Sequence, residues 1–154
     1  MGVREAVMPF IDGNSVASTS DDRFEVFTPI SGKSLYSMPV GSEADVNQAV
    51  ISARKAFDDN RWSDAPPSFK KTTLRHFANL IEQTAIELDT LDAEDMGKPL
   101  STGFANAQVA ASLVRFYAEA VDKLTGDVFT SDSTSLVTQR RVPFGVVAAI
   151  APWN

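Results

Sequence analysis

The last residues of the chain place an aromatic and an amide side chain directly after a run of small apolar residues. Gly145–Ala151 contains only glycine, valine, alanine and isoleucine, and Pro152 follows it. Because proline lacks a backbone donor, it ends a strand, so Trp153 and Asn154 should lie beyond the strand's carboxyl end, where open α/β sheets bind ligands. An asparagine amide there can donate a hydrogen bond to a developing oxyanion. The residues alone favour this role and a structural role equally. In the structural role Trp153 caps the core and Asn154 closes a turn.

Few other residues suggest chemistry. The sequence has no cysteine, one histidine (His76) and no pair of glycines spaced as G-x-G. These counts exclude a cysteine nucleophile within these residues, cysteine-based metal sites and the glycine-rich fingerprints of dinucleotide and phosphate binding. We expect His76 to be a surface or half-buried helix residue. A run of carboxylates suggests a metal or acid/base cluster at first, but its composition favours a solvated, acidic helix end; its members are Asp89, Asp92, Glu94 and Asp95.

Composition and charge indicate an ordinary soluble globular domain. Of the 154 residues, 44% are apolar and 22% are charged, and 14 basic against 20 acidic residues give a net charge of −6. This balance disfavours nucleic-acid binding, and the longest uncharged apolar run, Phe144–Trp153, is far shorter than the ~20 residues that span a bilayer. The N-terminus lacks a secretory signal pattern. We therefore expect a cytoplasmic protein that binds neither nucleic acid nor a membrane.

The spacing of apolar residues predicts short strands first and helices afterwards. A hairpin around Asp12-Gly13 and strands at 24–27 and 35–40 precede a helix that Ser42 caps, with Asp45 in the capping-box position. Helical spacing predicts a second helix over 69–96, either continuous or broken before residues 91–96. It predicts a third helix over 104–124. The chain is then extended at 128–130 and 136–141. Gly145–Ala151 is typical of a strand buried on both faces of a parallel sheet. These residues alone thus predict an α+β arrangement with three main helices.

Several short motifs follow one another along the chain. From the N-terminus they are Phe10–Gly13, Thr28-Pro29 with Gly32-Lys33, Ala53–Phe57 before Trp62, Asp95–Pro99, Arg115–Ala120 with Asp122–Gly126, Pro143-x-Gly145-Val146 and Pro152–Asn154. In this order and at this spacing the chain resembles the N-terminal portion of the NAD(P)-dependent aldehyde dehydrogenase family over essentially all its residues. The stretch Arg115–Lys123 looks most like members that act on amino- or γ-glutamylamino-aldehydes and on betaine aldehyde.

The resemblance implies an α/β fold and a cysteine-dependent reaction. In the family a cysteine thiolate attacks the aldehyde, a hydride passes to NAD or NADP, and a glutamate activates the water that hydrolyses the thioester. By resemblance Asn154 is the oxyanion donor and Val109 borders the substrate tunnel. The nicotinamide-ribose side of the cofactor cleft would be lined by Ile150, Ala151, Pro152 and Trp153.

A structural cation site is also implied. Asp95, together with the backbone carbonyls of Val26 and Phe27, matches a monovalent-cation site seen in some family members. An ordinary role in a turn is equally favoured for Asp95.

The resemblance finally divides the chain into parts. Residues 1–127 match N-terminal strands and helices of the cofactor-binding domain, 128–142 the first arm of the oligomerisation hairpin, and 143–154 the first strand of the cofactor-domain sheet. The family's cysteine and glutamate lie beyond the Pro-Trp-Asn point, so we expect an N-terminal piece that is inactive alone, from a homo-oligomeric enzyme with an aldehyde substrate. The alternative is a non-catalytic module that pairs with full-length subunits through the strands of 128–141.

Overall fold

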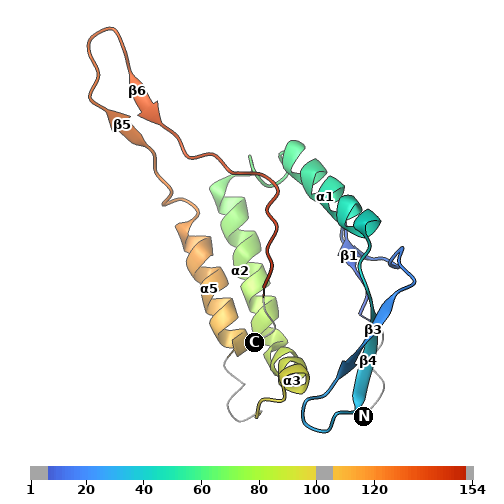
Figure 1. The fold of residues 1–154 in the computed structure, drawn as a ribbon. Helices are drawn as coiled ribbons and strands as arrows, with labels where there is room; N and C mark the ends of the chain where they lie inside the picture. The colour runs from blue at the N-terminus through green and yellow to red at the C-terminus, as the bar shows by residue number, and fades with distance from the viewer. Residues whose placement is uncertain (1–6, 100–105, 152–154) are drawn as a thin grey trace.

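The structure of the chain, a computed structural model, describes residues 7–99 and 106–151. Within them lie the helices α1 (Glu43–Asp58), α2 (Pro67–Gln83), α3 (Ala85–Met96) and α5 (Asn106–Ala120) and three two-stranded antiparallel sheets. Helices α2 and α5 lie side by side, with α1 and the N-terminal strands across from them and a hairpin projecting beyond α5 (Figure 1). The arrangement is α+β, as predicted. None of the helices in the described ranges is long and apolar enough to cross a membrane.

The N-terminal strands follow the turn signals in the sequence. Strands β1 (Phe10–Ile11) and β2 (Asn14–Ser15) pair across Asp12-Gly13, whose φ angles of +52° and +77° are those of a tight hairpin turn. Strands β3 (Arg23–Phe27) and β4 (Ser34–Pro39) form the second pair, and their register shifts between Val26 and Phe27. Both predicted hairpins are therefore present, the first with shorter strands than expected.

Asp45 joins the start of α1 to the segment that precedes β3. Its carboxylate accepts hydrogen bonds from the Ser42 backbone N–H at 2.9 Å, the Ser18 hydroxyl at 2.6 Å and the Thr19 backbone N–H at 3.1 Å. Ser42 in turn accepts from the Asp45 N–H, so the predicted capping box is confirmed. These bonds, that from Ser18 foremost, hold the pKa of Asp45 well below its usual range. The carboxylate is only 8% exposed, so it acts as a buried anchor rather than a simple cap.

The long helix predicted over 69–96 is two helices. The break falls at Thr84, where φ is −104° and ψ is +13°, and the Thr84 hydroxyl bonds back to the Leu80 carbonyl at 2.9 Å. No proline or glycine marks this position, so the sequence pattern continues across it. The later stop is as predicted: Gly97 ends α3 with φ +71°, and a Cβ there would lie 2.7 Å from Cγ of Pro29. The end of α3 thus packs on the turn between β3 and β4.

Alanines form the contact between α2 and α5. Ala78 of α2 and the α5 residues Ala107, Ala111 and Ala118 are buried, so the two helix backbones approach closely. Ion pairs flank this contact, joining Arg75 to Glu119 and Arg115 to Glu82. The larger apolar side chains that predicted α5 lie on its other side and are exposed. The helix also ends at Ala120, before the expected residue 124.

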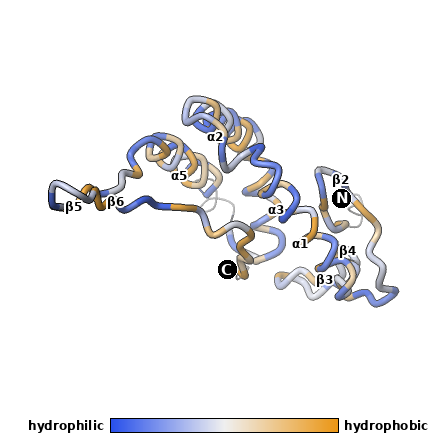
Figure 2. Tube along the Cα trace, turned by 90° about the horizontal axis from the view of Figure 1, so that it is seen from above, coloured by the Kyte–Doolittle hydropathy of each residue, from blue (hydrophilic) through white to orange (hydrophobic). Residues whose placement is uncertain are grey.

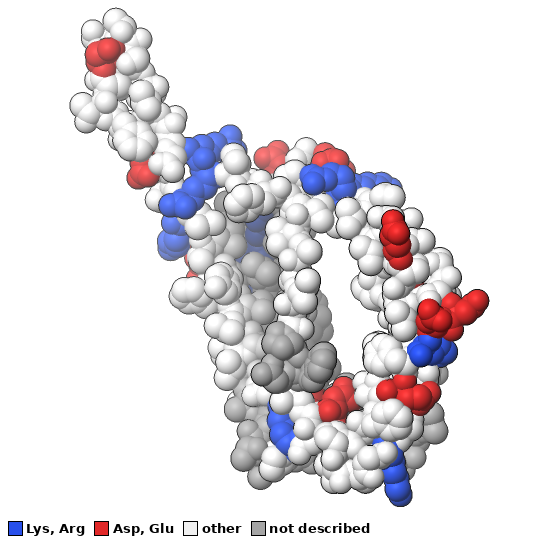
Figure 3. All heavy atoms as spheres, in the orientation of Figure 1, with Lys and Arg blue, Asp and Glu red and all other residues white. Residues whose placement is uncertain are grey.

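The chain leaves α5 through a hairpin and an extended tail. Strands β5 (Asp127–Phe129) and β6 (Val137–Gln139) pair antiparallel, and Figure 3 shows this hairpin standing away from the body with few charges on the visible face. At its base a Cβ on Gly126 would lie 2.0 Å from the Gln139 carbonyl oxygen. The predicted strand Gly145–Ala151 is apolar (orange near the C-terminus in Figure 2) but pairs with no strand of the described ranges.

Candidate functional site

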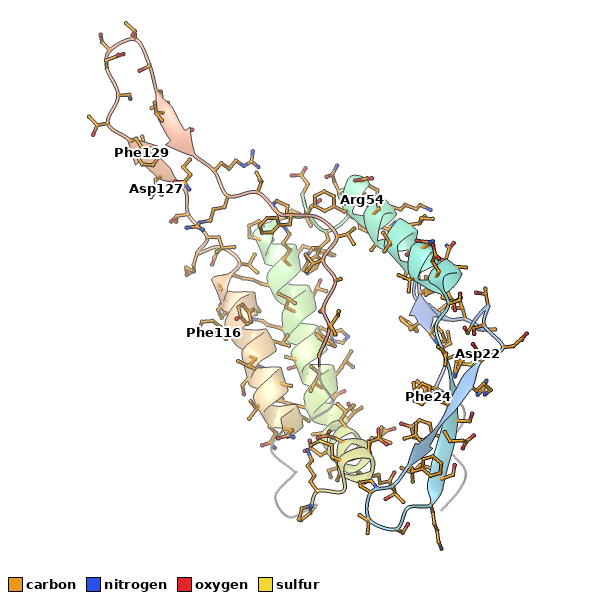
Figure 4. The ribbon with its side chains drawn as sticks, viewed as in Figure 1. Asp22, Phe24, Arg54, Phe116, Asp127 and Phe129 are labelled. Atoms are coloured by element: carbon orange, nitrogen blue, oxygen red, sulfur yellow. The ribbon has the colours of Figure 1, made fainter. Side chains whose placement is uncertain are left out.

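Val109, the residue predicted to border a substrate tunnel, lies in the first turn of α5. Its helix neighbours Ala107 and Ala111 are buried, whereas Val109 is 56% exposed. Leu113 and Phe116 continue the exposed stripe at helical spacing, and Phe116 points away from α2 (Figure 4). The stripe is therefore a continuous apolar surface, of the kind that contacts ligands or other protein segments.

The tail presents the two predicted cofactor-binding residues that the structure describes. Ile150 is 100% exposed, and Ala151 is exposed as well. Gly145 turns the tail past α1 with φ +99°, and a Cβ there would lie 3.1 Å from Nη1 of Arg54. Figure 3 shows an opening between the tail and α1, so one side of the tail is uncovered. Pro152, Trp153 and Asn154 lie outside the described residues, and their roles stay predictions.

Exposed apolar side chains of this kind suit one wall of a nicotinamide-ribose site. Ile150 and Ala151 offer van der Waals contact without charge, so they fit the ring and the sugar of NAD or NADP rather than its phosphates. Phosphates are bound by inward-pointing backbone N–H groups, typically at a helix N-terminus. Residues 145–151 form no helix, so they offer no phosphate site of this type, and the wall of the cofactor cleft stays a prediction.

Asp95, the predicted cation ligand, lies beside the β3–β4 pair. Its carboxylate accepts a hydrogen bond from the Tyr36 hydroxyl at 3.1 Å, and Tyr36 is the ladder partner of Val26. The predicted carbonyl ligands belong to Val26 and Phe27, between which the register shifts. Carboxylate and carbonyl oxygens suit a hard cation, so the donor types fit the predicted site. The described ranges hold no group of three or more His, Cys, Asp or Glu side chains that could bind a metal.

The acidic run at 89–95 is only in part the solvated helix end that composition favoured, since Asp95 is exposed but Asp89 is buried. Asp89 is 2% exposed, and its Oδ1 accepts from the Ala107 backbone N–H at 3.0 Å. Asp92 pairs with Lys98, which holds the pKa of Asp92 below its usual range, and it also accepts from Nδ2 of Asn106 at 3.2 Å. Both carboxylates therefore serve the start of α5. The sequence held one signal for the burial of Asp89. It lies four residues before Ala93, so the two share one face of the helix, and Ala93 is buried as well.

A shallow groove on α1 is lined by none of the predicted site residues that the structure describes. Its lining consists of Val50, Ile51, Arg54, Lys55, Asp58 and Asp59. All six come from one helix or its C-cap. Because one helix face supplies the whole lining, the groove offers no convergent polar groups of the kind that orient a substrate.

The chain matches a family model and curated relatives over nearly all its residues. The model described as "Aldehyde dehydrogenase family" matches residues 16–154. The chain belongs to the aldehyde dehydrogenase family. Among its relatives, the NADP/NAD-dependent aldehyde dehydrogenase PuuC of Escherichia coli (strain K12) is 37% identical over 146 residues, which are 94% of this chain and 30% of PuuC. The aminoacetaldehyde dehydrogenase of Pseudomonas aeruginosa is 32% identical over 94% of this chain and 29% of its own length.

Solved structures of aldehyde dehydrogenases have the same fold over this part of the molecule. The AldA indole-3-acetaldehyde dehydrogenase of P. syringae, in complex with NAD+ and IAA, matches with a TM-score of 0.91 and 37% identity, covering 99% of this chain and 31% of AldA. KauB of Pseudomonas aeruginosa matches with a TM-score of 0.89 and 38% identity. The chain therefore spans about 30% of the length of the aldehyde dehydrogenases that it matches.

Proposed function

We propose that the complete protein to which these residues belong oxidises an aldehyde to a carboxylate with NAD or NADP, through a thioester on a cysteine. The observation that carries this proposal is the family match over residues 16–154. The 37% identity to an NADP/NAD-dependent enzyme supports it. The proposal includes a cytoplasmic location for the complete protein.

Within this proposal three parts of the chain have roles in the reaction. The Asn154 amide donates to the oxyanion that forms when the thiolate adds to the aldehyde, because an uncharged donor stabilises that charge without burying another. Val109 contacts the substrate on the apolar surface of α5. Ile150, Ala151, Pro152 and Trp153 line the nicotinamide-ribose side of the cofactor cleft. The bound cofactor supplies the hydride acceptor.

The substrate class that we propose is an aldehyde carrying an amino or substituted amino group. The stretch Arg115–Lys123 supports this through its resemblance to family members with such substrates, and one relative is an aminoacetaldehyde dehydrogenase. The side chains of that stretch divide between the two faces of α5, since Arg115 pairs with Glu82 of α2 while Phe116 faces away from it. Only the face of α5 that carries Phe116 is available to a substrate.

Two further parts of the proposal concern structure rather than chemistry. Residues 1–127, 128–142 and 143–154 belong to different parts of the complete enzyme, and the β5–β6 hairpin joins its subunits. Asp95 with the carbonyls of Val26 and Phe27 binds a monovalent cation. The exposed apolar side chains of the hairpin, Val128 and Leu136, support a second candidate function, in which this chain pairs with full-length subunits as a non-catalytic module.

Steady-state kinetics of the complete protein test the proposal. Purified protein is given aminoaldehydes and unsubstituted aliphatic aldehydes of matched length, with NAD or NADP, and reduced cofactor is followed. We expect turnover, with higher kcat/KM for the aminoaldehydes. The 154-residue chain is the control and should give none, because it has no cysteine. Absence of turnover by the complete protein with every aldehyde would overturn the proposal, and turnover by the 154-residue chain would overturn the cysteine mechanism.

A further inference from the structure

Asp89 on α3 is a buried carboxylate for which the reaction proposed above has no use. It is 2% exposed and lies where α3 meets the first turn of α5. Its Oδ1 accepts a hydrogen bond from the backbone N–H of Ala107 at 3.0 Å, while its Oδ2 has no hydrogen-bond partner among residues 7–99 and 106–151. A carboxyl group is costly to bury, and this one accepts a single direct hydrogen bond from the described part of the chain. A residue of this type needs an explanation beyond packing.

The hydrogen bond that Asp89 accepts acts on the first turn of α5. The first N–H groups of a helix have no partner within the helix, and the helix dipole makes that end attractive to negative charge. Asp92, one turn further along α3, accepts from the Asn106 side chain on the same helix start. The two carboxylates bind different groups of α5. Asp89 accepts from its backbone, whereas Asp92 accepts from one of its side chains.

Val109 follows Ala107 by two residues, in that same first turn. At about 100° per residue, the two side chains lie about 200° apart around the helix axis. Ala107 therefore faces the protein interior and is buried, while Val109 faces outward and is 56% exposed. A rotation of the first turn that loosens the Asp89 bond would carry Val109 sideways across the apolar surface of α5.

We propose that Asp89 is a positioning residue for aldehyde binding: by holding the Ala107 N–H, it fixes the rotation of the first turn of α5 and so the place of Val109. This inference rests on the proposed function, because it gives Val109 the contact with substrate. Asp89 itself touches no substrate. Its effect should fall on substrate affinity and on the choice between bulky and small aldehydes, not on the chemical step.

The test uses the complete protein and three variants. Asp89→Leu keeps the outline of the side chain but removes the acceptor, Asp89→Asn keeps an acceptor oxygen, and Asp92→Leu makes the same change one turn away as a matched control. For Asp89→Leu we expect KM for a bulky aldehyde to rise about five- to tenfold with kcat changed less than about twofold. Asp89→Asn should restore most of this affinity, and Asp92→Leu should leave the ratio of kcat/KM between bulky and small aldehydes unchanged.

A double-mutant cycle with Val109→Ala distinguishes positioning from general destabilisation. If Asp89 acts through Val109, removing the valine should abolish most of the effect of Asp89→Leu on KM, so the two changes are not additive. Additive effects, an Asn variant as impaired as the Leu variant, or an unchanged KM in Asp89→Leu would each overturn the inference. None of these results would touch the proposed function, which fails only if the unaltered protein oxidises no aldehyde.

Hydrogen exchange provides a readout that needs neither activity nor a variant. In the unaltered protein the Ala107 amide should exchange at least roughly tenfold more slowly than the Ser68 amide in the first turn of α2, because Pro66 supplies no side-chain cap there. Equal exchange at the two amides would overturn the inference even if Asp89→Leu failed to fold.

Discussion

Two regions of the described chain differ in how much of their bonding and contact capacity is satisfied within the chain. At the anchored junction (Ser18, Thr19, Ser42 and Asp45), a buried carboxylate accepts hydrogen bonds from its own helix start and from the segment before β3. In the open region (residues 127–151), apolar side chains such as Val128, Phe144 and Ile150 are exposed. The first region satisfies its own polar groups, and the second leaves its apolar groups uncovered. A region of the first kind contributes stability by itself, whereas one of the second kind gains stability when something covers it.

The largest effect should come from Asn154, which follows the open region directly. Asn154→Ala in the complete protein should lower kcat/KM for aldehyde by a factor on the order of 10²–10³, because one oxyanion donor is lost. Rapid kinetics of reduced-cofactor formation measure it, and Asn154→Asp should be at least as damaging because a carboxylate repels the oxyanion.

Thermal unfolding and cofactor binding are the controls for Asn154→Ala. Both should stay near the values of the unaltered protein, since the sequence predicts that Asn154 lies in a loop beyond the strand-ending Pro152. A near-normal kcat/KM, or a loss of activity that only follows a loss of stability, would make Asn154 a structural residue.

The hairpin of the open region should control association. Val128→Asp places a charge on an exposed apolar side chain of β5 and should weaken self-association of the complete protein by roughly tenfold or more, if subunits pair there. Sedimentation velocity over a dilution series measures this change. Ser133→Asp adds the same charge at the hairpin tip and should have little effect. Equal weakening by both variants would show that net charge, and not a contact at Val128, governs association.

The anchored junction should respond in stability and not in association. Asp45→Ala leaves the Ser42 and Thr19 N–H groups without this acceptor and leaves the Ser18 hydroxyl only the Val40 carbonyl oxygen, so the unfolding midpoint of the complete protein should fall by roughly 2–4 °C. Glu43→Ala, in the first turn of the same helix, is the matched control and should shift the midpoint far less. A midpoint unchanged in Asp45→Ala would mean that water replaces the lost acceptor without cost.

A smaller effect is expected in the pH dependence of stability. The pKa of Asp45 is lowered in the folded chain, so its contribution to stability is present above the unfolded pKa of about 3.9 and is lost as pH falls toward the folded pKa. Urea unfolding below pH 4 should therefore show a steeper loss of stability in the unaltered protein than in Asp45→Ala. Parallel curves for the two proteins would contradict the lowered pKa.

A comparable test exists on the α2–α5 surface, where screening should reduce the effect. Hydrogen bonds from Lys123 and Lys71 lower the pKa of Asp122 to about 2. Its side chain is 38% exposed, so its pairs contribute little to stability. Asp122→Asn should leave the pH dependence of unfolding almost unchanged.

Local rules explain what the sequence predicted correctly. The capping box at Ser42 and Asp45, the turn at Asp12-Gly13 and the stop at Gly97 each depend on a few neighbouring residues. The motifs that carry the family resemblance are also short, and the family is confirmed. Predictions of this type need no knowledge of what lies across the fold.

Contacts between distant residues explain what the sequence did not predict. The apolar stripe with Phe116 was the strongest helical signal, yet α5 packs through its alanines, because close helix contact selects small side chains on the facing side. The burial of Asp89 depends on α5, which begins 17 residues later. The strand predicted at Gly145–Ala151 needs partner strands, and the described ranges hold none beside it.

The contact at the base of the hairpin has a consequence for sequence variation. Gly126 is exposed, and exposed positions usually accept most amino acids, yet any side chain there begins 2.0 Å from the Gln139 carbonyl oxygen. Every missense change of this codon must therefore spread the two strands where the arm leaves α5. Purifying selection should accordingly act on Gly126 as it acts on a core residue, and a saturation library should retain glycine there while the neighbouring Thr125 and Asp127 vary freely.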